Sequence, residues 1–448
     1  MKKYLLLLLS LMIFTPVVLT AQHDDANDDP FENDPFFTKP LKDWFSTDDM
    51  IDRVSDRSKR ILRSGGIDDG RRDITGFSSN PGFSYLDRMH SWVRYNRVDA
   101  LYLGIQSERY AELGRKNDRA LNPYWSVGYS FGRKDWLYTL GIERVFGFNR
   151  NFILGATHQR ITDSEDQWRV GWTENSLYSF FSVHDFMDYY SRMGTQFYAV
   201  YRPAQKVEFT VAYSDDKYTS LSKNSDFSVF SGDGNVRENH AIDEGKLQLL
   251  KTGIQFNPKD AMLSPGFSFA FDMTGEFSDL ISSDSDYAFD RVQTEMRSIV
   301  LLDESAVLRN RLKFVSVTGN APDFKYIPLG GISTMRATPF KSMMGSHSVL
   351  LNTELMFGFD AGKIYMEDVV DIDLRSFKFS FLADMGWTNG ISGRGLNLMD
   401  GFEEFRIKDF QTDVGFGVNL SAMRFEAAWN SNDLTTAPVI WLRFNPTF

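Results

Sequence analysis

Six histidines and their neighbouring carboxylates are the first candidates for chemistry in this 448-residue sequence, which contains no cysteine. None of the six stands at a metal-binding spacing from another histidine or acid; they are His23, His90, His158, His184, His240 and His347. His184 with Asp185 and Asp188 has the residue types that activate water, but three neighbouring polar residues are more often part of a loop. We find no nucleophile elbow, phosphate-binding loop or dinucleotide fingerprint. The sequence therefore predicts no enzyme, no cofactor and no metal site.

A second candidate is the glycine-rich stretch from Leu329 to Phe340, which has one arginine, Arg336, in its middle. A guanidinium offers planar donors that match a carboxylate in bidentate fashion. Asp384 and Glu354 lie on the polar faces of later alternating runs and are acceptors of the right type. We predict that this loop, about residues 320–345, folds into an enclosed interior with Arg336 as its anchor. The alternative is an arginine that simply faces water.

Composition narrows the class of protein. The formal net charge is −11, and an acidic chain is a poor candidate for sequence-independent binding of nucleic acid, which needs a basic face. Aromatic residues make up 15 % of the chain, with 39 Phe, 18 Tyr and 9 Trp. High aromatic content without long apolar runs suits a membrane β-barrel, whose strands show only half of their residues to lipid. It also suits a soluble all-β protein.

The first 21 residues read as a secretion signal. Lys2 and Lys3 form a positive start, an apolar core follows from Leu5 to Val18, and small residues end the segment at Ala21. The core is shorter than the roughly 20 apolar residues of a typical spanning helix. We therefore expect a cleaved signal peptide over 1–21 and an exported protein that is either soluble or crosses a membrane as strands. The strand pattern described below favours the second, with a location in the outer membrane of a Gram-negative-type cell.

Residues 22–93 differ from the rest of the chain. An acidic cluster at 23–29 matches no calcium-loop template, so we expect a solvated linker there. A helix should begin at the N-cap Ser46 and end at Gly65 and Gly66. The helix is either a short periplasmic helix or one that caps the mouth of a barrel.

From about residue 94 to the end, hydrophobicity follows a period of two. About fifteen such runs, separated by polar Gly/Asp/Ser-rich connections, predict an all-β, antiparallel transmembrane barrel over 94–448. Bacterial barrels prefer even strand numbers, so sixteen strands are expected, with twelve or fourteen as alternatives. The section Trp168 to Arg192 could hold one strand, two strands or a helical insertion.

The last runs alternate most regularly. In Phe377 to Trp387 the apolar face carries Phe379 and Phe381, whereas the other face carries Lys378 and Asp384. The final run, from Pro438, places Phe444 and Phe448 on its apolar face, and an aromatic carboxy-terminus is what we take as the C-terminal strand signal. This pattern turns aromatic side chains toward lipid and ionic groups toward a wet interior.

The stretch from Gly330 to Phe340 resembles the lumenal loop of BamA/TamA-type barrels, also called the bacterial surface antigen family. That loop has a Gly-Gly turn, here Gly330 and Gly331, and then an Arg-Gly-aromatic signature. Arg336 takes the arginine position, but Ala337 and Thr338 replace the glycine and the aromatic residue.

A second element of the resemblance is an aromatic strand that ends in Asp-x-Gly, which Phe381 to Gly386 matches. In that family the aspartate receives the loop arginine, so the resemblance implies a pairing of Arg336 with Asp384. Five strands follow the loop, as in a sixteen-stranded family barrel. Typical members also carry periplasmic POTRA modules of βααββ pattern, which residues 22–93 do not show.

The resemblance implies a protein that helps to insert or move proteins or lipids at the outer membrane, with membrane lipid and periplasmic or outer-membrane proteins as partners. It also implies a weakly closed seam between the first and last strands, here Tyr95–Gly104 against Val439–Phe448. The alternative is a passive channel or receptor barrel that has the same wall and no assembly activity.

Overall fold

The structure is a computed structural model that describes residues 93–444, apart from gaps at 108–120, 148–150, 205, 231–235, 259, 261–262, 279, 281–283, 304–305, 359–362, 367–369, 374–376, 391–397, 399, 403–404 and 421–422. The predicted signal peptide, the acidic linker, the helix after Ser46 and the terminal Phe448 lie outside the described residues.

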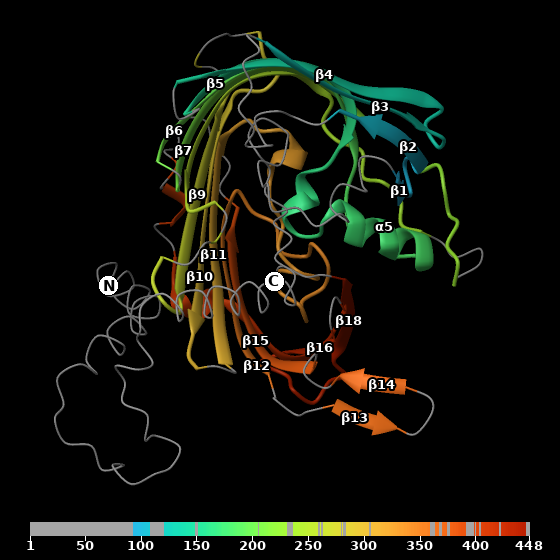
Figure 1. Ribbon diagram of the computed structural model, residues 1–448, viewed down its shortest axis with the longest axis vertical. Coiled ribbons are helices and arrows are strands. Elements are labelled where there is room, and N and C mark those ends of the chain that lie inside the picture. The colour runs from blue at the N-terminus through green and yellow to red at the C-terminus, as the bar shows by residue number, and fades with distance from the viewer. Residues whose placement is uncertain are drawn as a thin grey trace, which may run out of the picture.

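Sixteen antiparallel strands form one curved sheet, which confirms the predicted fold and strand number (Figure 1). Each strand pairs with its neighbour in the chain, and β13 and β14 form a separate hairpin between β12 and β15. In order, the strands are β1 Val93–Asn96, β2 Ala100–Gln106, β3 Asn122–Ser130, β4 Asp135–Phe146, β5 Phe152–Asp163, β6 Tyr190–Ala204, β7 Val207–Ser220, β8 Gly245–Phe256, β9 Phe267–Phe277, β10 Phe289–Leu301, β11 Ala306–Gly319, β12 His347–Gly358, β13 Lys363–Met366, β14 Val370–Asp373, β15 Phe377–Asn389, β16 Gln411–Leu420, β17 Met423–Asn430 and β18 Val439–Phe444.

The two faces of the sheet differ in chemistry. On β17, Met423 and Phe425 are exposed on the outside, whereas Arg424 and Glu426 are buried on the inside. A similar alternation runs around much of the wall, with exposed Leu, Ile, Phe or Trp side chains on β2 to β8 and on β15 to β18. Buried polar groups therefore face the lumen and apolar groups face outward, as expected of a barrel that crosses a membrane on its strands.

Most of the long connections leave the wall at one end. They span residues 164–189, 221–244, 320–346 and 390–410, and the first three reach into the interior. We call residues 320–346, which join β11 to β12, the lumenal loop. Its stretch from Ile327 to Arg336 is buried throughout, so this part of the loop lies inside the barrel.

The first predicted strand, Tyr95–Gly104, is wrong as a single element. It is a hairpin in which β1 ends at Asn96 and β2 begins at Ala100. The side-chain oxygen of Asn96 accepts hydrogen bonds from the backbone N–H groups of Val98 and Asp99, an Asx-type turn that reverses the chain. The first edge strand of the sheet is therefore β1, which the structure describes over Val93–Asn96.

The section whose structure the sequence left open, Trp168 to Arg192, contains a helix. A 3-10 turn over Glu165–Trp168 is followed by α5 over Trp172–Phe181, and β6 begins at Tyr190. Within the described residues no helix is both long and apolar enough to cross a membrane.

Candidate functional site

The guanidinium of Arg336 lies among three carboxylates from three strands. Its Nη1 is 2.5 Å from Oδ1 of Asp384 on β15, its Nη2 is 2.7 Å from Oε1 of Glu354 on β12, and its Nε is 3.1 Å from Oε2 of Glu426 on β17. All four side chains are fully or almost fully buried. Each nitrogen of the guanidinium thus donates to a different carboxylate, which fixes both its position and its orientation.

Strand register explains why these groups meet. Asn352 on β12 pairs with Asp384 on β15, which in turn pairs with Asp413 on β16, so three polar side chains form an inward row under the loop. Asn352 donates to Asp384 Oδ1 and to the backbone carbonyl of Thr334. The loop therefore rests on a row of acceptors and amides that period-two alternation places on one face.

Further cations share the same carboxylates. Arg424 on β17 donates to both oxygens of Glu354, at 3.1 and 2.8 Å, and Arg309 on β11 lies 3.5 Å from it. The attraction between one buried carboxylate and several arginines offsets the free-energy cost of removing these charges from water. Losing one arginine would leave an uncompensated charge in the lumen.

The backbone after Arg336 is held as well. Asp413 accepts hydrogen bonds from the N–H groups of Ala337 and Thr338 and from the Thr338 hydroxyl. Trp441 on β18 donates its indole N–H to the Arg336 carbonyl at 2.9 Å. Ala337 and Thr338, where this sequence departs from the family signature, are therefore used through their backbone and hydroxyl groups.

Gly330 and Gly331 make the turn that precedes the arginine. Their φ angles are 111° and 84°, a region that residues with a Cβ rarely adopt. A Cβ on Gly330 would lie 2.2 Å from the carbonyl oxygen of Pro339, which is backbone and cannot move aside easily. The N–H of Gly331 donates to the carbonyls of Met335 and Thr338, which closes the loop on itself.

Most of the predicted site residues lie together. Arg336, Asp384, Glu354 and the two glycines are within one buried network, whereas Phe444 points outward at the far edge of the wall. Sequence reasoning missed Glu426 and Asp413. The only signal for either residue was its position on the inward face of its strand. The neighbouring residues do not show which inward acids reach the loop.

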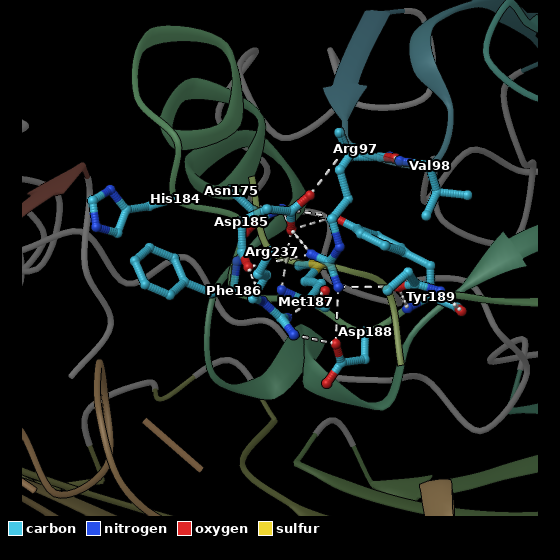
Figure 2. A network of polar contacts seen from close by, with 12 residues as sticks. Arg97, Val98, Asn175, His184, Asp185, Phe186, Met187, Asp188, Tyr189 and Arg237 are labelled. Atoms are coloured by element: carbon cyan, nitrogen blue, oxygen red, sulfur yellow. Dashed lines mark hydrogen bonds and ion pairs between the residues drawn. The ribbon is translucent and has the colours of Figure 1, made fainter. Parts of the chain in front are cut away.

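A second network lies beside α5 and the turn between β1 and β2 (Figure 2). Arg97 reaches Asp185 at 3.0 Å and Asp188 at 2.8 Å, and Arg237 from the 221–244 connection reaches Asp188. Arg97 and Asp185 have side chains that are entirely buried. The network joins the connections 164–189 and 221–244 to the turn of the first hairpin.

This network also holds the lumenal loop. Lys341 donates to Asp166 at 2.7 Å and to Asp188 at 2.5 Å, and Arg169 donates to the carbonyls of Gly330 and Pro328. Burial alone would raise the pKa of the Asp188 carboxyl, but Lys341, Arg237 and Arg97 outweigh it and hold the pKa well below its usual range.

The acid–histidine group considered in the sequence is not assembled. Asp185 and Asp188 are occupied by arginines, and the His184 ring stacks on Phe186 with centroids 6.0 Å apart and contacts Ser182. Among the described residues there is also no group of three or more metal-binding side chains.

A family model described as the C-terminal domain of a family of unknown function (DUF5686) matches residues 77–300, half of the 448-residue chain. The chain belongs to this family. No curated protein sequence matches it. The matched family is not the bacterial surface antigen family, so the resemblance noted in the sequence extends to the kind of barrel and no further.

Three solved structures are similar at low identity. BamA from Haemophilus ducreyi lacking POTRA domains 1-3 has 11 % identity and a TM-score of 0.47, and the match covers 79 % of this chain and 68 % of that one. CdiB from Acinetobacter baumannii has 10 % identity and a TM-score of 0.39, with 77 % and 55 % covered. CdiB from Escherichia coli has 10 % identity and a TM-score of 0.40, with 78 % and 60 % covered. The chain spans less than two thirds of either CdiB protein.

Replacing Lys341 with alanine should loosen the lumenal loop of this DUF5686 protein without unfolding the wall. Asp166 and Asp188 would lose the cation that links them to the loop. We expect faster amide hydrogen exchange within residues 320–346 and unchanged exchange in β6 to β10. Lys408, which is exposed, provides the matched control, and equal exchange in Lys341→Ala and Lys408→Ala would refute the link.

Acid should weaken the second network only at low pH. Because the pKa of Asp188 is depressed, its contribution is complete above the ordinary carboxyl value near 3.8 and is lost as pH falls below it. Protease resistance of residues 164–189 should therefore be the same at neutral pH and at mildly acidic pH. Asp188→Asn should be less resistant at both; loss of resistance in the natural protein already at mildly acidic pH would contradict this.

Proposed function

We propose that this protein is an outer-membrane barrel that helps to insert or move proteins or lipids through the seam between its first and last strands. One observation carries the proposal: β1 and β18 are the two ends of the strand order, and no pairing joins them within residues 93–444 as described. Over these residues the sheet thus has two edges, whereas a fully paired barrel has none.

Over the described residues, the two edges are Val93–Asn96 of β1 and Val439–Phe444 of β18. Unpaired strand edges present backbone donors and acceptors to which an incoming strand can add. A wall with two such edges supports lateral passage of an extended client segment, with the bilayer beside it. Periplasmic or other outer-membrane proteins are the partners that we propose.

The interior gives little support to the alternative of a passive channel. The lumenal loop lies across the lumen with Arg336 and its partners buried, and the second network adds another buried layer. A receptor role would need a site for a ligand, whereas the lumenal cations Arg336 and Arg97 form ion pairs with carboxylates of the protein itself. We propose no catalytic activity.

A cleavable lock across the seam tests the proposal. The chain has no cysteine, so Tyr95→Cys with Ser176→Cys, and separately Tyr178→Cys with Phe444→Cys, can be joined by a short bifunctional thiol reagent that reductant cleaves. The purified variants are reconstituted in vesicles, and insertion of an unfolded barrel client is followed by its protease protection. We expect locked protein to lose the activity and reduced protein to regain it.

Single-cysteine variants treated in the same way are the controls. Equal client insertion by locked and reduced protein, or insertion no faster than in empty vesicles, would overturn the assembly role. A steady single-channel conductance that locking leaves unchanged would favour the passive channel instead.

A further inference from the structure

Helix α5 occupies the gap between the two edges of the sheet. Figure 1 shows it between β1 and β18, and contacts to both strands place it there. It belongs to the connection between β5 and β6, so it reaches the seam from across the barrel.

On the β18 side, α5 pairs through one carboxylate. Glu174 accepts from Nε and Nη2 of Arg443 at 2.8 and 3.1 Å, and it also accepts from the backbone N–H of Phe444 at 2.9 Å. That N–H is a donor of the unpaired edge. The helix thus satisfies a group that a neighbouring strand would otherwise bind.

On the β1 side, α5 acts together with residues 224–230. The backbone N–H of Tyr95 donates to the Ser176 hydroxyl at 3.3 Å, and the Tyr95 hydroxyl donates to the Phe227 carbonyl at 2.9 Å. The N–H groups of Val229 and Phe230 donate to the carbonyls of Phe180 and Phe181, which are terminal carbonyls of the helix. We call α5 with residues 224–230 the seam patch.

Helix α5 has aromatic residues on both faces, and Trp172 and Tyr178 pack toward the interior. Its Glu174, Asn175 and Ser179 are buried toward the interior. Leu177, Phe180 and Phe181, at spacing i, i+3 and i+4, share the other face, where both phenylalanines are exposed. A surface helix in water would turn its apolar stripe inward.

The exposed face of α5 lies beside the outer surface of the barrel wall. Tyr95 and Phe444 are outward-facing residues of the two edge strands; Tyr95 contacts Phe180 with ring centroids 5.5 Å apart, and Phe444 contacts Tyr178 at 5.9 Å. Phe230 stacks on Phe181 at 5.6 Å and is 79 % exposed. An exposed aromatic surface therefore runs from β1 onto Phe180, Phe181 and Phe230, beside the apolar outer face of the barrel. On the β18 side, Phe444 contacts Tyr178, which is half-buried and packs on Phe186.

We propose that the seam patch completes the barrel wall in place of strand pairing, and that its outward aromatic side chains lie in the acyl chains of the bilayer. Continuity of the exposed phenylalanines with the lipid-facing wall at β1 identifies the occupant. A helix can serve in this place because its backbone bonds are internal, as hydrocarbon requires, and the adjoining edge donors are capped by Glu174 and Ser176.

Spin labels on single cysteines test the proposal directly. Phe181→Cys and Phe230→Cys are labelled with a nitroxide in protein reconstituted in phosphatidylcholine vesicles, and collisions with oxygen and with a water-soluble nickel chelate are compared. Phe381→Cys on β15, 62 % exposed on the outer wall, is the lipid control, and Glu238→Cys, whose side chain is exposed, is the water control. We expect both seam labels to match the label at 381, with frequent oxygen and rare nickel collisions.

Two results would overturn the proposal. Nickel collisions at 181 and 230 as frequent as at 238 would place the patch in water, and low collision rates with both reagents would place it against protein. Heat-modifiable gel mobility shows which labelled variants are folded, and Phe227→Cys, at a residue 56 % exposed, replaces any that is not. The spin-label measurement needs no client protein, so its outcome does not depend on that of the seam-lock experiment. Either proposal can therefore fail while the other stands.

Discussion

Arg336→Ala is expected to lower the free energy of unfolding by about 3–5 kcal/mol, the cost of breaking a buried ion pair from one side. Three buried carboxylates, Asp384, Glu354 and Glu426, would lose a shared cation. Arg336→Lys should recover little, because one ammonium cannot reproduce the planar set of donors that meets three acceptors at once.

The measurement is urea unfolding of the reconstituted protein, followed by heat-modifiable gel mobility and protease resistance. Arg160→Ala is a matched control, since Arg160 is 39 % exposed and its ion pair with Asp135 lies near the surface. Such surface pairs contribute about 0–1 kcal/mol. If the Arg336 and Arg160 variants unfold at the same urea concentration, the lumenal anchor is wrong.

Gly330→Ala is expected to have the second largest effect. The φ angle of 111° costs a residue with a Cβ about 1–3 kcal/mol in backbone strain. The new methyl would also lie 2.2 Å from the carbonyl oxygen of Pro339, so the turn must open. Because the turn sets the direction in which Arg336 enters the lumen, we expect the loop to undock in part, with faster hydrogen exchange over residues 329–343.

Gly390→Ala is the control for this substitution. A Cβ at Gly390 would meet no heavy atom within 4 Å, so the change adds a methyl without a clash. Hydrogen exchange and urea unfolding should be unchanged there. Unaltered stability of the Gly330 variant as well would show that the glycine turn is not what holds the loop.

The wall was predictable because alternation is a local signal. On β15 and β17, apolar and polar residues alternate, so strand boundaries and inward faces follow from adjacent residues. The first strand was mispredicted because Asn96 turns the chain through its own side chain, and a single Asx turn inside a mixed run leaves the period almost intact.

The sequence predicted the kinds of residue that form the site but not all of its members. Arg336 and Asp384 stood out as a lone loop cation and an inward acid, and the family resemblance joined them. Glu426 could not be found that way, because its distance from Arg336 depends on how the sheet curves from β15 to β17. Helix α5 was left open because it has aromatic residues on both faces, with Phe180 and Phe181 outward and Trp172 and Tyr178 inward, which weakens the usual link between amphipathic pattern and burial.

The connection of residues 164–189 is attached to both the lumenal loop and the seam. Arg169 and Asp166 bind the loop, whereas Glu174 and Ser176 bind the two edge strands. Thermodynamic linkage makes such an arrangement reciprocal. A molecule that bound the lumenal loop and displaced this connection would favour separation of β1 from β18. Separation of these strands would raise the affinity of the protein for that molecule by the same factor.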